Sequence, residues 1–140
     1  MQLDENIRWK FRYDGDFRQK VLKLIDLVSE MQEKELSGNF DYNQGRQIFN
    51  LFLSTFNGAV RTLKDYMRYQ GIFQVDTREI IKEAFYVEII EDGQSWIDMM
   101  FDANDVNPQT LEGFDFYTLS TRYLKAFTDL VKYFQERTEK

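Results

Sequence analysis

The sequence has no histidine and no cysteine, and it contains one proline among 140 residues. Without imidazole the chain has no general base that titrates near neutral pH, no histidine-activated nucleophile and no histidine metal ligand. Without a thiol it has no thiolate nucleophile, disulfide or zinc finger, which suits a reducing compartment. Only carboxylate, lysine or tyrosine chemistry remains open to a catalyst, and we expect neither a metal nor a cofactor.

Long apolar runs and an excess of basic residues are also missing. No run approaches the roughly 20 residues that a membrane-spanning helix needs, and the N-terminus has no signal-peptide pattern. The formal charge of -6 at pH 7 argues against nucleic-acid binding, which depends on clustered lysine and arginine. We therefore expect a soluble, unprocessed protein of the cytoplasm.

Aromatic residues, in contrast, are abundant, with 13 Phe, 8 Tyr and 2 Trp. A single domain of this length buries about two-thirds of the surface that its unfolded chain exposes. So many rings exceed what one small bundle hides, and we predict a homodimer with an aromatic interface. Its expected contributors are Phe52, Tyr117, Tyr123 and Phe127.

Apolar residues recur at spacings of three and four along most of the chain, which is the period of amphipathic helices. This pattern predicts long helices over residues 17–35 and 46–70, another from residue 77, and a last one from about residue 114. Turn-forming residues 36–45 form the expected first connection. With no convincing buried strand, the expected fold is all-α: an up-and-down four-helix bundle with a short additional helix, in one domain over residues 1–140.

Local signals predict several helix ends. Gly71 is expected to stop the second helix, and Asp76 with Glu79 has the form of a capping box for the third. The expected apolar face of the third helix comprises Ile80, Ile81, Ala84, Phe85 and Val87. Residues 1–13 alternate apolar and polar side chains and suit an extended N-terminal arm, with a helical start as the alternative. Gly58, inside the second helix, suggests that a neighbouring backbone approaches closely.

The short helix from Asp92 toward Pro108 carries two different faces. Trp96, Met99 and Met100 form a stripe that should face the core, with Trp96 more typical of packing than of base stacking. Three carboxylates follow another face at i, i+4 and i+7: Asp98, Asp102 and Asp105. A solvated row of carboxylates is their ordinary interpretation, and Mg²⁺ binding is the less favoured alternative.

Basic residues form a stripe on the second helix, comprising Arg61, Lys64 and Arg68. Such a stripe is usually a solvated face, and the functional alternative is contact with an anion or a partner. If the short helix packs beside the second one, the acidic and basic stripes can approach each other, either within one chain or across the dimer. They would then form a surface ion-pair ladder or leave a groove in which a ligand replaces the carboxylates.

Three separated blocks resemble the nucleotidyltransferase substrate-binding family, which belongs to the HEPN-type helical bundles. They read Thr-Leu-Lys-Asp-Tyr at residues 62–66, Arg-Glu-x-x-x-Glu-Ala-Phe at 78–85 and Trp-x-x-Met at 96–99. The likeness covers most of residues 45–130. It implies a homodimeric bundle that serves as the non-catalytic partner of a minimal, separately encoded nucleotidyltransferase, in a pairing similar to toxin and antitoxin.

Ribonuclease members of the wider group carry an arginine and, several residues later, a histidine after an acidic residue that matches Asp102. Ala103 and Pro108 stand at those two positions here, so the cation and the acid-base group of that chemistry are missing. Gly58 and Val60 replace larger side chains of relatives and would widen a groove. The alternatives are a HEPN-like ribonuclease or toxin with a degenerate or relocated site, and a purely structural oligomer.

The resulting candidates for contact with a substrate, a nucleotide or other anionic ligand, or a partner are Arg61, Lys64, Arg68, Trp96, Asp98, Asp102, Asn104 and Asp105. Turn formation is the ordinary role of Asp102 and Asn104 at the end of a helix.

Overall fold

A computed structural model describes residues 16–36, 38 and 41–138 of the chain. The predicted arm over residues 1–13 lies outside this part. The described residues are helical without a strand, which confirms the predicted fold class. None of the described helices is long and apolar enough to cross a membrane.

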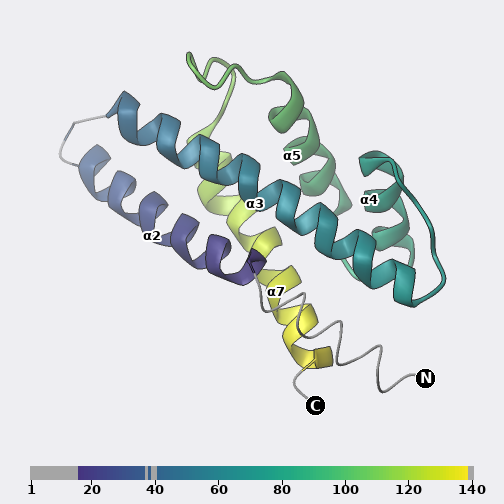
Figure 1. Cartoon of the computed structure of the whole chain (residues 1–140). Helices are drawn as coiled ribbons and strands as arrows, with labels where there is room; N and C mark the ends of the chain where they lie inside the picture. Colours follow the sequence, from purple (N-terminus) through teal and green to yellow (C-terminus); the bar gives the residue numbers. More distant parts are fainter. Residues whose placement is uncertain (1–15, 37, 39–40, 139–140) are drawn as a thin grey trace.

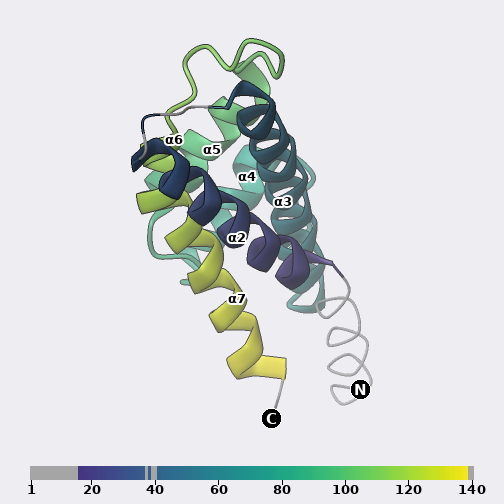
Figure 2. The same cartoon turned by 90° about the vertical axis from the view of Figure 1, so that its left-hand side faces the viewer.

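The described chain forms five helical segments, and the last of them runs without a break from α-helix through a π-helical turn back to α-helix (Figure 1). Their bounds are α2 Phe17–Leu36, α3 Tyr42–Tyr69, α4 Thr77–Tyr86, α5 Gly93–Asp105, α6 Phe116–Thr118, the π-helical turn η1 Leu119–Tyr123 and α7 Leu124–Thr138. Helix α3 contacts α2, α4 and α5, whereas α7 contacts α2 (Figure 2). Helix α3 is therefore the element that joins the two sides of the bundle.

Aromatic rings from α3 form the centre of the core. The Phe52 ring lies between Tyr123, at a centroid distance of 5.6 Å, and Phe127, at 6.2 Å. Phe56 contacts Trp96 of α5, whose ring meets Phe127 edge to face. The apolar residues that recur along the second predicted helix are thus confirmed as core, except that Val60 is half-buried: Phe49, Phe52, Phe56, Leu63 and Met67.

Helix α3 begins earlier than predicted and ends as predicted. Asp41 accepts hydrogen bonds from the backbone N–H groups of Asn43 and Gln44, so the helix begins at Tyr42 within the expected loop. At the other end, Gly71 has a φ of 81° and its N–H donates to the Arg68 carbonyl. This left-handed conformation costs glycine little, and it terminates the helix.

Helix α4 begins at Thr77 as predicted, but the capping box is wrong. Asp76 lies at the cap position without a side-chain cap hydrogen bond, and the Glu79 carboxylate lies 3.6 Å from the Lys82 ammonium group instead. Phe85 and Val87 are 48% and 41% exposed, so they do not belong to the buried face.

The position at which α4 ends determines which of the following residues are buried. The helix ends at Tyr86, and the next turn inserts Ile89 and Ile90 into the core in place of the predicted residues. The N–H of Ile89 donates to the Ala84 carbonyl and holds this turn against the helix.

Two further predictions about packing are wrong. Apart from the adjacent backbone of α3 itself, no atom of the described residues lies within 4 Å of the position that a Cβ of Gly58 would occupy, so no neighbouring helix among them brings its backbone close. Phe52, Tyr123 and Phe127 are almost completely buried within the chain, and they cannot form a dimer interface. Tyr117 is exposed, and dimerisation itself stays a prediction.

Candidate functional site

The start of α5 is fixed by Asp92, as predicted. Its carboxylate accepts hydrogen bonds from the backbone N–H of Ser95 at 3.0 Å and from the Ser95 hydroxyl at 2.5 Å. Burial raises the pKa of Asp92, but these two hydrogen bonds outweigh it and leave the pKa below its usual value. The cap orients α5 so that Trp96, Met99 and Met100 face the core, which confirms the predicted apolar stripe.

A π-helical turn opposite α5 is the main feature that periodicity did not predict. The N–H of Leu124 donates to the Leu119 carbonyl, five residues back. Within this turn, the hydroxyl groups of Ser120 and Thr121 both donate to the Tyr117 carbonyl. Side-chain hydroxyls that compete for helix carbonyls distort the regular ladder, and single π-turns are frequent at functional sites.

The π-turn brings two consecutive side chains to α5. The Arg122 guanidinium lies 2.8 Å from the Asp98 carboxylate and also donates to the Ser95 hydroxyl at 3.1 Å. The Tyr123 hydroxyl donates to the Asp102 carboxylate at 2.5 Å. These five residues, Ser95, Asp98, Asp102, Arg122 and Tyr123, are called the α5–π cluster below.

Burial governs the electrostatics of the tyrosine and its carboxylate. Burial raises the pKa of Asp102, neighbouring Asp98 and Asp105 add to the increase, and the Tyr123 hydrogen bond opposes it. The pKa of Tyr123 is far above its usual value, first because of burial and then because of its hydrogen bond to Asp102. Tyr123 therefore remains a hydrogen-bond donor at every physiological pH.

The α5–π cluster borders a polar hollow of about 240 Å³. Its lining residues are Asp98, Phe101, Asp102, Gly113, Asp115, Thr118, Arg122 and Tyr123. Three carboxylates face one guanidinium, and that guanidinium is already paired with Asp98. The hollow consequently favours hydroxyl, amine or ammonium groups of a ligand over an anion.

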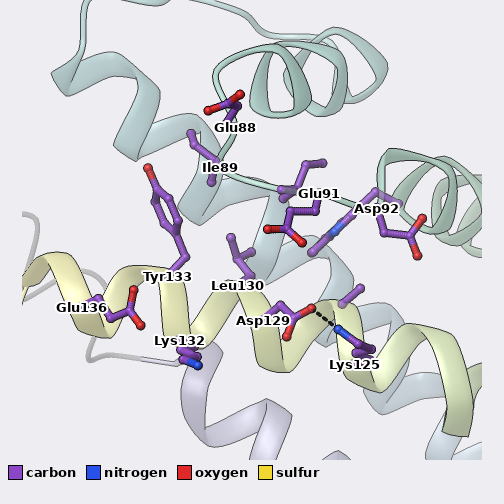
Figure 3. A pocket seen from close by; sticks show the side chains of 13 residues that line it. Glu88, Ile89, Glu91, Asp92, Lys125, Asp129, Leu130, Lys132, Tyr133 and Glu136 are labelled. Atoms are coloured by element: carbon purple, nitrogen blue, oxygen red, sulfur yellow. Dashed lines mark hydrogen bonds and ion pairs between the residues drawn. The ribbon is translucent and has the colours of Figure 1, made fainter.

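A second hollow of about 320 Å³ lies between the turn after α4 and helix α7 (Figure 3). Figure 3 shows Leu130 and Tyr133 of α7 pointing toward the segment that contains Ile89 and Glu91. Its charged residues are Glu88, Glu91, Asp92, Lys125, Asp129, Lys132 and Glu136. The Lys125 ammonium is 2.8 Å from the Asp129 carboxylate, so a clear acidic excess remains.

The predicted contact between the acidic and basic stripes is not made within the described chain, and the same contact across a dimer stays a prediction. Within the described ranges no ion pair joins Arg61, Lys64 or Arg68 to the carboxylates of α5, and Asp98 pairs with Arg122. The reason is the orientation of α5, whose apolar face turns toward α3, with Trp96 against Phe56.

The remaining candidates lie in different environments. Arg61 and Arg68 are exposed, Lys64 is half-buried, and Asn104 and Asp105 are exposed at the end of α5. Trp96 is buried in the core. No group of three or more potential metal ligands occurs among the residues that the structure describes. Of the eight candidates, the α5–π cluster includes Asp98 and Asp102, and the binding roles of all eight stay predictions.

The sequence interpretation missed Ser95 and Arg122 as site residues and assigned Tyr123 to an interface. Arg122 and Ser95 are 27 positions apart, and no local pattern connects them. The one available signal was the adjacent hydroxyl pair Ser120 and Thr121, which can perturb a helix.

Comparison with protein-family models identifies a family that this chain matches. A family model described as "Nucleotidyltransferase substrate binding protein like" matches residues 46–140, about two-thirds of the chain. The matched part contains most of α3 and every residue that lines the two hollows. A search of curated proteins finds no match. The chain therefore belongs to the nucleotidyltransferase substrate-binding family.

Proposed function

We propose that this chain is a non-catalytic, dimeric subunit that docks a separately encoded nucleotidyltransferase and helps to present the acceptor substrate of that enzyme. The family match over residues 46–140 is the observation that carries the proposal. The α5–π cluster supports it, because the cluster lies within the matched part and borders a hollow suited to a polar ligand.

The hydrogen bonds of the cluster favour binding over catalysis. Asp98 is held by Arg122 on one oxygen, and Gln94 donates to the other at 2.8 Å. Asp102 uses one oxygen for Tyr123, and the described residues offer no donor to its Oδ1 atom. That oxygen is available to a hydroxyl or amino group of a ligand. An acceptor with several such groups suits a transferase that modifies one of them.

The fixed geometry of these groups also suits presentation of a substrate. Tyr123 is 2% exposed and its ring stacks on Phe52, so the hydroxyl that orients Asp102 is anchored in the core. A carboxylate that is already oriented loses less conformational freedom when a ligand binds. The half-buried Asp102 would hence hold an acceptor in one orientation while the partner enzyme transfers the nucleotidyl group.

The test combines the purified chain with single-domain nucleotidyltransferases of the same genome, beginning with any encoded next to it. Calorimetry measures binding, and transfer from a labelled nucleoside triphosphate to hydroxyl-rich acceptors measures presentation. We expect saturable binding of one enzyme and faster transfer in the presence of the chain. Asp102→Asn should reduce the stimulation, whereas Asp26→Asn, at an exposed position on α2, should not.

The rival function, a ribonuclease with a relocated site, is tested with the same preparations. Purified chain is incubated with labelled RNA. Dose-dependent cleavage that Asp102→Asn abolishes would overturn the non-catalytic proposal and favour the rival.

A further inference from the structure

Exposed apolar side chains gather around α4. Phe85 is 48% exposed, Tyr86 71% and Val87 41%, and the turn before the helix adds Phe73 and Val75 at 72% and 80%. These residues account for half of the large, exposed hydrophobic side chains in the described part of the chain. Phe85, Tyr86 and Val87 are consecutive at the end of α4, and an exposed apolar patch of this kind marks a surface that binds another molecule.

This patch includes a preformed groove of about 420 Å³ between α4 and the start of α5. Ile81, Phe85, Tyr86 and Ile97 supply most of its apolar lining. The Phe85 ring lies directly against Gly93, since a Cβ there would be 3.1 Å from Cδ1 of the ring. The glycine thus allows the ring to lie flat against α5 and form one wall of the groove.

The groove adjoins the acidic hollow of Figure 3. Glu91 and Asp92 line both depressions, so the apolar groove continues into a region with five carboxylates and two lysines. One of these lysines, Lys125, is paired with Asp129. On the other side of the groove, Lys82 is close to Glu79 and adds little net positive charge. The joined surface is therefore apolar at one end and acidic at the other.

We propose that this joined surface is the docking site for the nucleotidyltransferase, and that the enzyme inserts apolar anchors flanked by lysine or arginine. The inference rests on the proposed function and specifies its interface. Charge complementarity determines the choice of occupant, because the acidic end requires a basic partner. A second copy fits poorly, because a two-fold interface over the whole joined surface would place the carboxylates against the same carboxylates or against the apolar groove, on chains that each carry a formal charge of -6.

The test measures the affinity of the full chain for its nucleotidyltransferase, with one variant for each end of the surface. Tyr86→Ser removes an exposed apolar contact, and Glu91→Lys reverses a charge at the acidic end. The matched controls are Tyr42→Ser, at a position that is 59% exposed on α3, and Glu33→Lys, at an exposed position on α2. Circular dichroism checks that all four variants are folded.

We expect each surface variant to weaken binding about tenfold, as buried interface residues do, and each control to change it less than about twofold. Added salt should weaken wild-type binding more than it weakens binding of Glu91→Lys. If the wild type binds and both surface variants bind equally well, the docking site is elsewhere and this inference fails alone. If the wild type binds no nucleotidyltransferase, the proposed function itself fails.

Sedimentation of the same variants tests the alternative occupant. We expect Tyr86→Ser to leave the mass of the free chain unchanged. Conversion of a dimer to a monomer by this substitution, with unchanged affinity for the enzyme, would assign the groove to a second copy and overturn the inference.

Discussion

Replacement of Tyr123 by phenylalanine isolates the hydrogen bond that anchors the α5–π cluster. The substitution removes the hydroxyl that donates to Asp102 at 2.5 Å but keeps the ring that stacks on Phe52. Hydrogen bonds to charged groups contribute about 1.5–3 kcal/mol to stability. Because Asp102 is only half-buried, solvent replaces part of the lost bond, and we expect a loss of about 1–2 kcal/mol.

A matched control exists within the same helical segment. The hydroxyl of Tyr133 lies 3.4 Å from that of Tyr66, a long contact between neutral groups. Tyr133→Phe should consequently cost about 0.5 kcal/mol or less. Urea denaturation at pH 7 measures both free energies of unfolding, and equal slopes against urea would show that the unfolded state is unchanged.

The pH dependence adds a second check on Tyr123→Phe. The hydrogen bond favours the charged form of Asp102, so its loss should raise the pKa of Asp102 further. A carboxyl whose pKa is raised by folding binds its proton more tightly in the folded state than in the unfolded state. The stability that Asp102 contributes therefore falls as pH rises from its ordinary pKa of about 3.8 through its folded pKa. The deficit of Tyr123→Phe should hence be larger at pH 7 than below pH 3.8.

Two results would refute this reasoning. A Tyr123→Phe variant as stable as the wild type would mean that the hydrogen bond from Tyr123 to Asp102 does not contribute to stability. A loss no greater than that of Tyr133→Phe at all pH values would mean that the charge on Asp102 is irrelevant.

Three other substitutions test the packing and the helix ends by thermal and urea unfolding. Asp92→Ala should cost about 1 kcal/mol of stability by removing the cap of α5. Folding lowers the pKa of Asp92, so this loss of stability should vanish as pH falls below 3.8 through the folded pKa. A loss that persists at that low pH would contradict the role of the charge. Gly58→Ala should stabilise α3 by about 0.5–1 kcal/mol, because its Cβ would meet open space, whereas Gly71→Ala at φ 81° should destabilise by about 1 kcal/mol; the same sign for both would refute the assignment. Phe52→Ala should cost about 3–5 kcal/mol by opening a cavity beneath Tyr123, and a loss below 1 kcal/mol would show that the rings around it are not a packed core.

Periodicity was sufficient to predict the long helices. The repeated apolar positions of α3, including Phe49, Phe52 and Phe56, are buried as expected because a helix that joins two sides of a bundle needs a continuous apolar stripe. Gly71 and Asp92 were predictable for a different reason. Each acts through hydrogen bonds to its immediate neighbours, so the required information is local.

Apart from the local capping box of Asp76 and Glu79, the failures concern residues whose partners are distant in sequence. The spacing of Asp98 and Asp102 placed them on one face of a helix, but it carried no information on which element faces them. Arg122 reaches Asp98 from 24 positions away, and only the π-turn allows it and Tyr123 to reach α5 together. Similarly, the exposure of Phe85 depends on where Ile89 is inserted, which is decided by the tertiary fold.

The most direct test of the central claim is the calorimetric titration of the chain with the nucleotidyltransferases of its own genome. We predict saturable binding to one of them at a fixed stoichiometry, together with faster nucleotidyl transfer to a hydroxyl-rich acceptor that depends on Asp102. Absence of heat with every such enzyme, with cleavage of labelled RNA by the chain alone, would contradict the account.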